Sequence, residues 1–106
     1  MLITGTVIAH PGQDVELPCT VKPNNDREGA SWIIADGGPY GVNALHGGIL
    51  AGYSTDIGNN NLIVQNIVIN DRRNGTVYQC VITLVLGGRL VRSGNRIILY
   101  VAGKYQ

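Results

Sequence analysis

The sequence predicts an all-β fold that is built from short strands joined by tight turns. Glycine, proline and asparagine recur about every ten residues, and the segments between them are short and rich in β-branched side chains, which is typical of a sandwich or barrel. Every second residue from Val15 to Val21 is apolar, as in a strand with one buried face. The chain of 106 residues is long enough for one hydrophobic core and too short for two, so we expect residues 1–106 to form one domain.

Other segments have the apolar, β-branched composition of strands. Those predicted as strands are Ala30–Ala35, Leu62–Ile69, Val77–Leu86, Arg89–Arg92 and Ile97–Val101. Gly87-Gly88 is a glycine pair that can adopt the positive φ angles of a tight hairpin turn. The glycine-rich stretch 36–61 predicts only one or two weak edge strands.

Composition and charge exclude several classes of protein. A hydrophobic content of 44% with 14% charged residues is unlike a disordered tail, and no apolar run is long enough to insert into a membrane as a helix. The net charge of +1 argues against a general nucleic-acid binder. Residues 1–71 carry two basic and seven acidic side chains, whereas residues 72–106 carry six basic and no acidic ones. The last third is therefore predicted to be electropositive.

Two cysteines, the single tryptophan and one tyrosine form a spaced motif. Cys19 and Cys80 each lie at the centre of a predicted strand, Trp32 follows Cys19 by 13 residues, and Tyr78 precedes Cys80 by two. Over nearly the whole chain this pattern resembles immunoglobulin-superfamily domains, and the 60 residues between the cysteines favour the variable type (V-set). The resemblance implies a sandwich of two antiparallel sheets with Greek-key connections. It also implies a Cys19–Cys80 disulfide, a core signature of Trp32, Tyr78 and Leu17, and a hydrogen bond from Tyr78 to the backbone near Asn74. The alternative is two buried free thiols in a cytosolic protein.

Some variable-type features are missing from the sequence. The family's glutamine three residues after the tryptophan is Ala35 here, and its aspartate six residues before the second cysteine is Asn74. No arginine between residues 28 and 71 is available to pair with an acid at that position. The family's glycine bulge on the last strand is reduced to Gly94-Asn95. The missing glutamine weighs against antibody-like pairing of two variable domains.

Strand parity predicts a partner-binding face. If both cysteines point inward, the alternate residues of their strands point outward, and a symmetric Gly87-Gly88 hairpin places Leu90 opposite Val85 and Arg92 opposite Thr83. An outward-facing apolar patch commonly marks a partner site. The residues expected on this face, the front (GFCC′) sheet of the family, are Ile33, Ala35, Gln79, Val81, Thr83, Val85, Leu90 and Arg92. The alternatives are that residues 36–61 cover the patch, or that scattered surface aliphatics carry no meaning.

The resemblance implies a non-catalytic recognition or adhesion domain, extracellular, from a cell-surface receptor or a secreted protein. Its partner would be a protein, including a second copy as a homodimer. No catalytic residue, metal site or cofactor is predicted, because His10 and His46 are isolated from other metal-ligating residues once the cysteines are bridged.

Two further features suggest contacts or modification. Arg89, Arg92 and Arg96 could attract an acidic partner or an acidic, sulfated glycan, or could protect an exposed edge strand. Asn74 begins the only Asn-x-Ser/Thr sequence, so it is a candidate for N-glycosylation.

Two other functions remain open. One is an antigen-receptor-like variable domain that binds through the end loops, residues 22–29, 43–61 and 85–92. The other is a secreted carbohydrate-binding module, which would need an exposed aromatic platform at Tyr40 or Tyr53.

Overall fold

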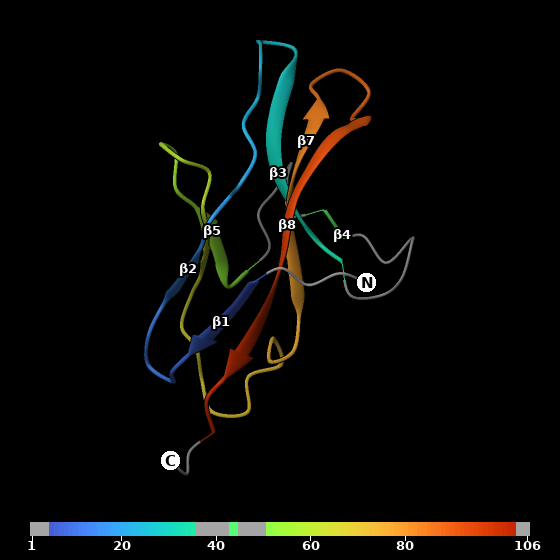
Figure 1. Ribbon diagram of the computed structural model, residues 1–106. Helices are drawn as coiled ribbons and strands as arrows, with labels where there is room; N and C mark the ends of the chain where they lie inside the picture. The colour runs from blue at the N-terminus through green and yellow to red at the C-terminus, as the bar shows by residue number, and fades with distance from the viewer. Residues whose placement is uncertain (1–4, 36–42, 45–50, 104–106) are drawn as a thin grey trace.

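The computed structural model describes residues 5–35, 43–44 and 51–103, and every regular element within them is a β-strand. Two sheets form, one of five strands in the order β1-β8-β7-β3-β4 and one of three in the order β2-β6-β5 (Figure 1). The strands are β1 (Gly5–Ala9), β2 (Val15–Leu17), β3 (Glu28–Ile34), β4 (Asn43–Ala44), β5 (Tyr53–Thr55), β6 (Leu62–Val64), β7 (Val77–Leu84) and β8 (Leu90–Val101). β1 runs parallel to β8 and the other pairings are antiparallel.

The core lies between the two sheets. The three-stranded sheet contributes Leu17, Leu62 and Val64, and the five-stranded sheet contributes Trp32 and Tyr78, all of them buried. Cys19, just after β2, is bonded to Cys80 of β7 with their Cα atoms 5.3 Å apart, so the bridge ties the two layers together. The indole N–H of Trp32 donates to the Asn60 carbonyl at 2.6 Å, which satisfies the one polar group that this ring buries. The all-β sandwich predicted from the sequence is confirmed.

β8 replaces two of the predicted strands with one. The register with β7 shifts between Gln79 and Val81, so that Gly94 and Asn95 form a bulge opposite Cys80. Gly94 is needed there because an added Cβ would lie 2.5 Å from Thr20 Oγ1 and 3.1 Å from the Cys80 carbonyl. Thr20 Oγ1 accepts the Asn95 N–H at 2.9 Å. The bulge therefore lets the segment after β2 contact the five-stranded sheet directly.

β6 is shorter than the predicted strand Leu62–Ile69. Asn66 adopts a φ of 53°, a left-handed conformation that asparagine tolerates better than most residues, and the chain leaves the sheet there. Ile67 nevertheless stays buried, and its N–H donates to the Gln13 carbonyl at 3.0 Å. Of the weak edge strands expected between 36 and 61, β4 and β5 fall among the described residues, whereas Tyr40 and His46 lie outside them.

Candidate recognition surface

The middle of the predicted partner-binding face is buried. The prediction that Ala35, Gln79 and Val81 are open to a partner is therefore wrong. Ala35, Gln79 and Val81 are buried, with Val81 only 1% exposed, and the Gln79 side-chain amide donates to the Gly94 carbonyl at 2.9 Å. Ile33 and Thr83 are half-buried. Parity identifies the side of the sheet to which a side chain points, but it does not say whether that side meets solvent. Among the described residues, the centre of this face therefore offers little apolar surface to a partner.

The hairpin between β7 and β8 also differs in register from the prediction. Thr83 pairs with Leu90 and Ile82 pairs with Arg92, because Val91 is an extra residue at a second bulge. The predicted pairs Leu90–Val85 and Arg92–Thr83 are wrong. Since opposed residues of antiparallel strands share a face, Arg92 lies on the side of the fully buried Ile82, which is the inner side of the sheet.

Arg92 consequently bonds to other parts of the chain and does not point outward toward an anion. We call its contacts with Glu28 and Lys22 the Arg92 fastener. Its Nη2 atom lies 2.7 Å from Glu28 Oε1 and donates to the Lys22 carbonyl, also at 2.7 Å. The hydrogen bond from Arg92 lowers the pKa of the Glu28 carboxyl. Arg92 thus connects β8 to β3 and to the segment before it. Of the other two arginines singled out, Arg89 is exposed at the hairpin and Arg96 is half-buried opposite Gln79.

The hairpin loop is docked on the loop that precedes β3. Five residues, 85–89, connect the strands, and the Leu84 N–H donates to the Arg89 carbonyl at 2.8 Å. Gly87 and Gly88 have φ angles of 83° and 67°, which glycine adopts without steric cost. The Val85 N–H donates to the Arg27 carbonyl at 2.8 Å. The loop therefore has a fixed position against residues 22–27, and Figure 1 shows the two at the same end of the molecule.

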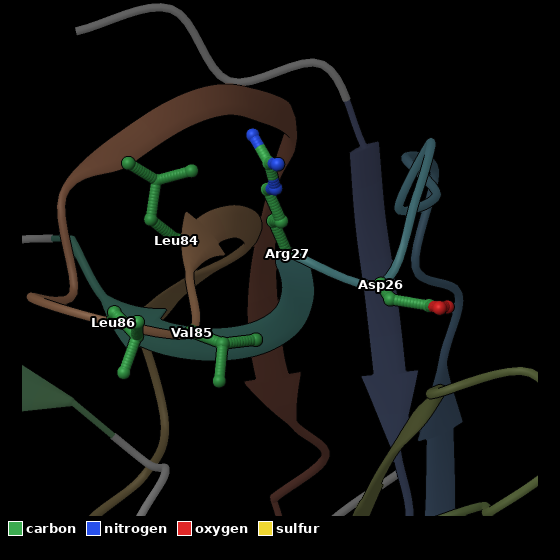
Figure 2. Close-up of a pocket in the computed structure, with 5 residues that line it drawn as sticks. All are labelled: Asp26, Arg27, Leu84, Val85 and Leu86. Carbon is green, nitrogen blue, oxygen red and sulfur yellow. The ribbon is translucent and has the colours of Figure 1, made fainter.

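Exposed aliphatic side chains gather at this end. Leu86 is 88% exposed and Val85 64% exposed, and Leu90 and Val91 at the start of β8 are exposed as well. We call Val85, Leu86, Leu90 and Val91 the hairpin end. Beside it lies a shallow hollow of about 370 Å³, which Asp26, Arg27, Leu84, Val85 and Leu86 line (Figure 2).

Three solved structures share the fold of this chain. A chicken TCR superposes with a TM-score of 0.72 at 18% sequence identity, over 97% of this chain and 50% of its own. The N-terminal four Ig domains of Dscam1 isoform 6.44 give a TM-score of 0.58 at 20% identity, over 92% of this chain and 22% of theirs. The extracellular domain of the voltage-gated sodium channel beta4 subunit gives 0.57 at 14% identity, over 95% and 87%.

The fold is that of an immunoglobulin domain. No family model and no curated protein matches the sequence, so the likeness is one of structure. The chain spans half of the chicken TCR chain and 22% of the Dscam1 chain. The beta4 subunit structures are described as parallel homodimers that explain its role in cell–cell adhesion.

The chain contains a polar anchor at the opposite end of β7 that the sequence analysis missed. The Nη2 atom of Arg73 lies 2.8 Å from Oδ2 of Asp71, and the Asp71 side chain is 5% exposed. The guanidinium also donates to the carbonyls of Gly52, Gln65 and Asn66. The hydrogen bonds from Arg73 hold the pKa of Asp71 well below its usual range. No arginine between residues 28 and 71 was available to pair with an acid in this turn. Arg73 makes that pair from within the turn, with Asp71.

The two tyrosines near this anchor are buried and bond to each other. The hydroxyls of Tyr53 and Tyr78 are 2.6 Å apart and buried, and burial raises the pKa of both phenols. Among the described residues, the Tyr78 hydroxyl bonds to the side chain of Tyr53, whereas the expected partner was the backbone near Asn74. Tyr53 packs edge-on against Tyr78, with the Arg73 guanidinium 5.5 Å from its ring centre. A buried ring cannot serve as a sugar platform, which removes Tyr53 from the carbohydrate-binding hypothesis.

Within residues 5–35, 43–44 and 51–103, no group of three or more His, Cys, Asp or Glu side chains is placed to hold a metal ion. In the same part of the chain no helix has the length and hydropathy to span a membrane.

Proposed function

We propose that this chain is a non-catalytic, extracellular, variable-type recognition domain that binds a protein partner through the hairpin end. Of the hypotheses raised by the sequence, this one is nearest to the end-loop alternative. A front-sheet interface of the kind first expected would have to use the buried Gln79 and Val81, whereas Val85 and Leu90 from the same predicted face are exposed.

The observation that carries the proposal is a cluster of exposed aliphatic side chains on a fixed loop. Two adjacent pairs, Val85-Leu86 and Leu90-Val91, flank the tip of the β7–β8 turn, and gathered exposed apolar side chains commonly mark interaction sites. The hydrogen bond from Val85 to Arg27 and the Arg92 fastener hold the loop in place. A loop that is already ordered loses less conformational entropy when a partner binds.

The remaining parts of the proposal have separate support. The variable type is supported by β1 running parallel to β8 and by β4 extending the sheet beyond β3. An extracellular location is supported by the Cys19–Cys80 bridge, because disulfides persist in oxidising compartments. A recognition role is supported by the receptor and adhesion proteins that share the fold.

Fluorescent tetramers of the disulfide-bonded domain, applied to a panel of cell types, would test the proposal. Staining should be lost with Leu86→Asp and kept with Ile8→Asp, which adds the same charge at an exposed aliphatic residue of β1. Sedimentation of the purified domain over a concentration series, with the same two variants, tests a second copy as the partner. Equal sensitivity to the two variants contradicts the hairpin end as the binding surface. A domain that neither stains cells nor self-associates contradicts the recognition function.

A further inference from the structure

The turn before β7 presents the Asn74-Gly75-Thr76 sequence at the surface. Asn74 and Gly75 are exposed, and an added Cβ at Gly75 would meet nothing within 4 Å. The turn is well defined, because the Asn74 N–H donates to the Asp71 carbonyl and the Thr76 N–H to the Arg73 carbonyl, each at 3.1 Å. The Arg73 anchor therefore fixes the position of this asparagine.

The orientation of the Asn74 side chain leaves its nitrogen available. Its Oδ1 atom accepts the Val101 N–H at 2.8 Å. Because a backbone N–H can only donate, the amide oxygen must face β8. The Nδ2 atom then lies on the other side of the amide group, and a substituent on it does not require the bond to Val101 to break.

We propose that Asn74 is the attachment site of an N-linked glycan. The chemistry is transfer of an oligosaccharide from a lipid-linked pyrophosphate donor in the secretory pathway. A bond forms between Nδ2 and the anomeric carbon of the first sugar, the bond from that carbon to the pyrophosphate oxygen breaks, and Nδ2 loses one proton as the lipid pyrophosphate leaves. The required Asn-x-Ser/Thr pattern is met by Asn74 and Thr76. This inference rests on the extracellular location proposed above.

The position of Asn74 separates the glycan from the proposed binding surface. The eight residues of β7, at about 3.3 Å per residue, place roughly 26 Å between the turn and the hairpin end. The loop that leads into this turn exposes Val68 and Ile69, and a hydrophilic glycan there would make this apolar surface more soluble. The two ends of β7 would thus have different uses, with the glycan at one and the partner at the other.

The test is secretion of the full chain, behind a cleavable signal, from mammalian cells, followed by mass measurement before and after peptide-N-glycosidase treatment. The wild type should lose one discrete mass step. In ¹⁸O water the enzyme should convert Asn74 to ¹⁸O-labelled aspartate, which distinguishes glycan removal from earlier deamidation of Asn74-Gly75. Asn74→Gln and Thr76→Val should abolish the step, whereas Thr76→Ser and the control Asn24→Gln should retain it. Because Thr76→Val keeps Asn74 and its bond to Val101, the result does not depend on tolerance of the glutamine.

Two outcomes contradict different proposals. A secreted, disulfide-bonded protein with unmodified Asn74 overturns the glycan site and leaves the recognition proposal intact. A chain that is not secreted, or that is secreted with two alkylatable thiols, overturns the extracellular location and with it the glycan.

Discussion

Replacing Arg73 with methionine should destabilise the domain far more than its position in a turn implies. The variant keeps most of the apolar stem but removes the partner of Asp71 and the donor to three carbonyl groups. The Asp71 carboxylate stays at a site where its side chain is only 5% exposed. It would retain the N–H groups of Val68 and Arg73 as donors, but no neutralising charge.

The expected magnitude follows from the burial of Asp71. Removing one partner of a buried ion pair costs about 3–5 kcal/mol, a large part of the roughly 5–15 kcal/mol that stabilises a typical domain. At about 4 °C or more per kcal/mol for a domain of this size, the Tm should fall by at least about 12 °C. An exposed ion pair would contribute only about 0–1 kcal/mol, so the two cases are well separated.

Urea unfolding followed by fluorescence of the single, buried Trp32 measures this loss. Arg72→Met is the matched control, because Arg72 is adjacent and exposed and should change the free energy of unfolding by less than about 0.5 kcal/mol. The double variant Arg73→Met/Asp71→Asn should recover part of the loss, since the unpaired charge is gone. If Arg73→Met and Arg72→Met have similar unfolding free energies, the anchor does not stabilise the fold.

Three other predictions follow from the same contacts. The pKa of Asp71 is lowered in the folded state, so its stabilising effect should be complete above the usual carboxyl pKa of about 4 and should decline as the pH falls further; urea titrations across that range test this. Gly94→Ala should cost about 1–3 kcal/mol by overpacking against Thr20, measured in the same assay. Arg92→Met should release residues 22–27 and speed hydrogen exchange at the Val85 amide, measured by NMR.

Each of these has a contradicting outcome and a control. A stability profile for Arg73→Met/Asp71→Asn that falls with acid as steeply as the wild type would rule out Asp71 as the titrating group. Gly103→Ala, at a site with open space, should be neutral, and an equal cost at Gly94 and Gly103 would contradict crowding at the bulge. Unchanged Val85 exchange in Arg92→Met would show that the fastener does not hold the loop.

The sequence predicted the architecture well because local pattern and covalent constraint agreed. The resemblance to immunoglobulin-superfamily domains implied a Cys19–Cys80 bridge between the layers and a core that contains Trp32 and Tyr78. The structure has both, with the bridge formed and the two rings buried. Alternation within a strand is a local property, so the inward direction predicted for these side chains was correct.

The candidate surface was predicted less well for two reasons. It depends on the pairing register of β7 with β8, and on which side chains of the outer face are buried. The bulges at Gly94-Asn95 and at Val91 each add a residue, and the second moves Arg92 from the outer to the inner face. Alternation alone contains no signal for such an insertion. It likewise has no signal for the burial of Val81, which lies on the predicted side but does not meet solvent.

The Arg73 anchor was missed for a different reason. An arginine upstream, between residues 28 and 71, was the expected partner of an acid in this turn, whereas Asp71 and Arg73 are two residues apart within the turn itself. The available signal was the close spacing of Asp71 and Arg73 in the segment before the predicted strand Val77–Leu86. A turn with an aspartate at its start can orient a following arginine through the backbone, as the hydrogen bond from the Arg73 N–H to Asp71 does here.

If the partner-binding surface lies at the β7–β8 hairpin, Leu86 and Leu90 must meet solvent, whereas Val81 and Ile82 in the middle of the five-stranded sheet must not. Methyl NMR spectra recorded with a soluble paramagnetic agent measure this directly, without knowledge of the partner. The methyl signals of Leu86 and Leu90 should broaden strongly while those of Val81 and Ile82 stay sharp. Broadening of Val81 as strong as that of Leu86 would contradict the account and return the binding surface to the sheet.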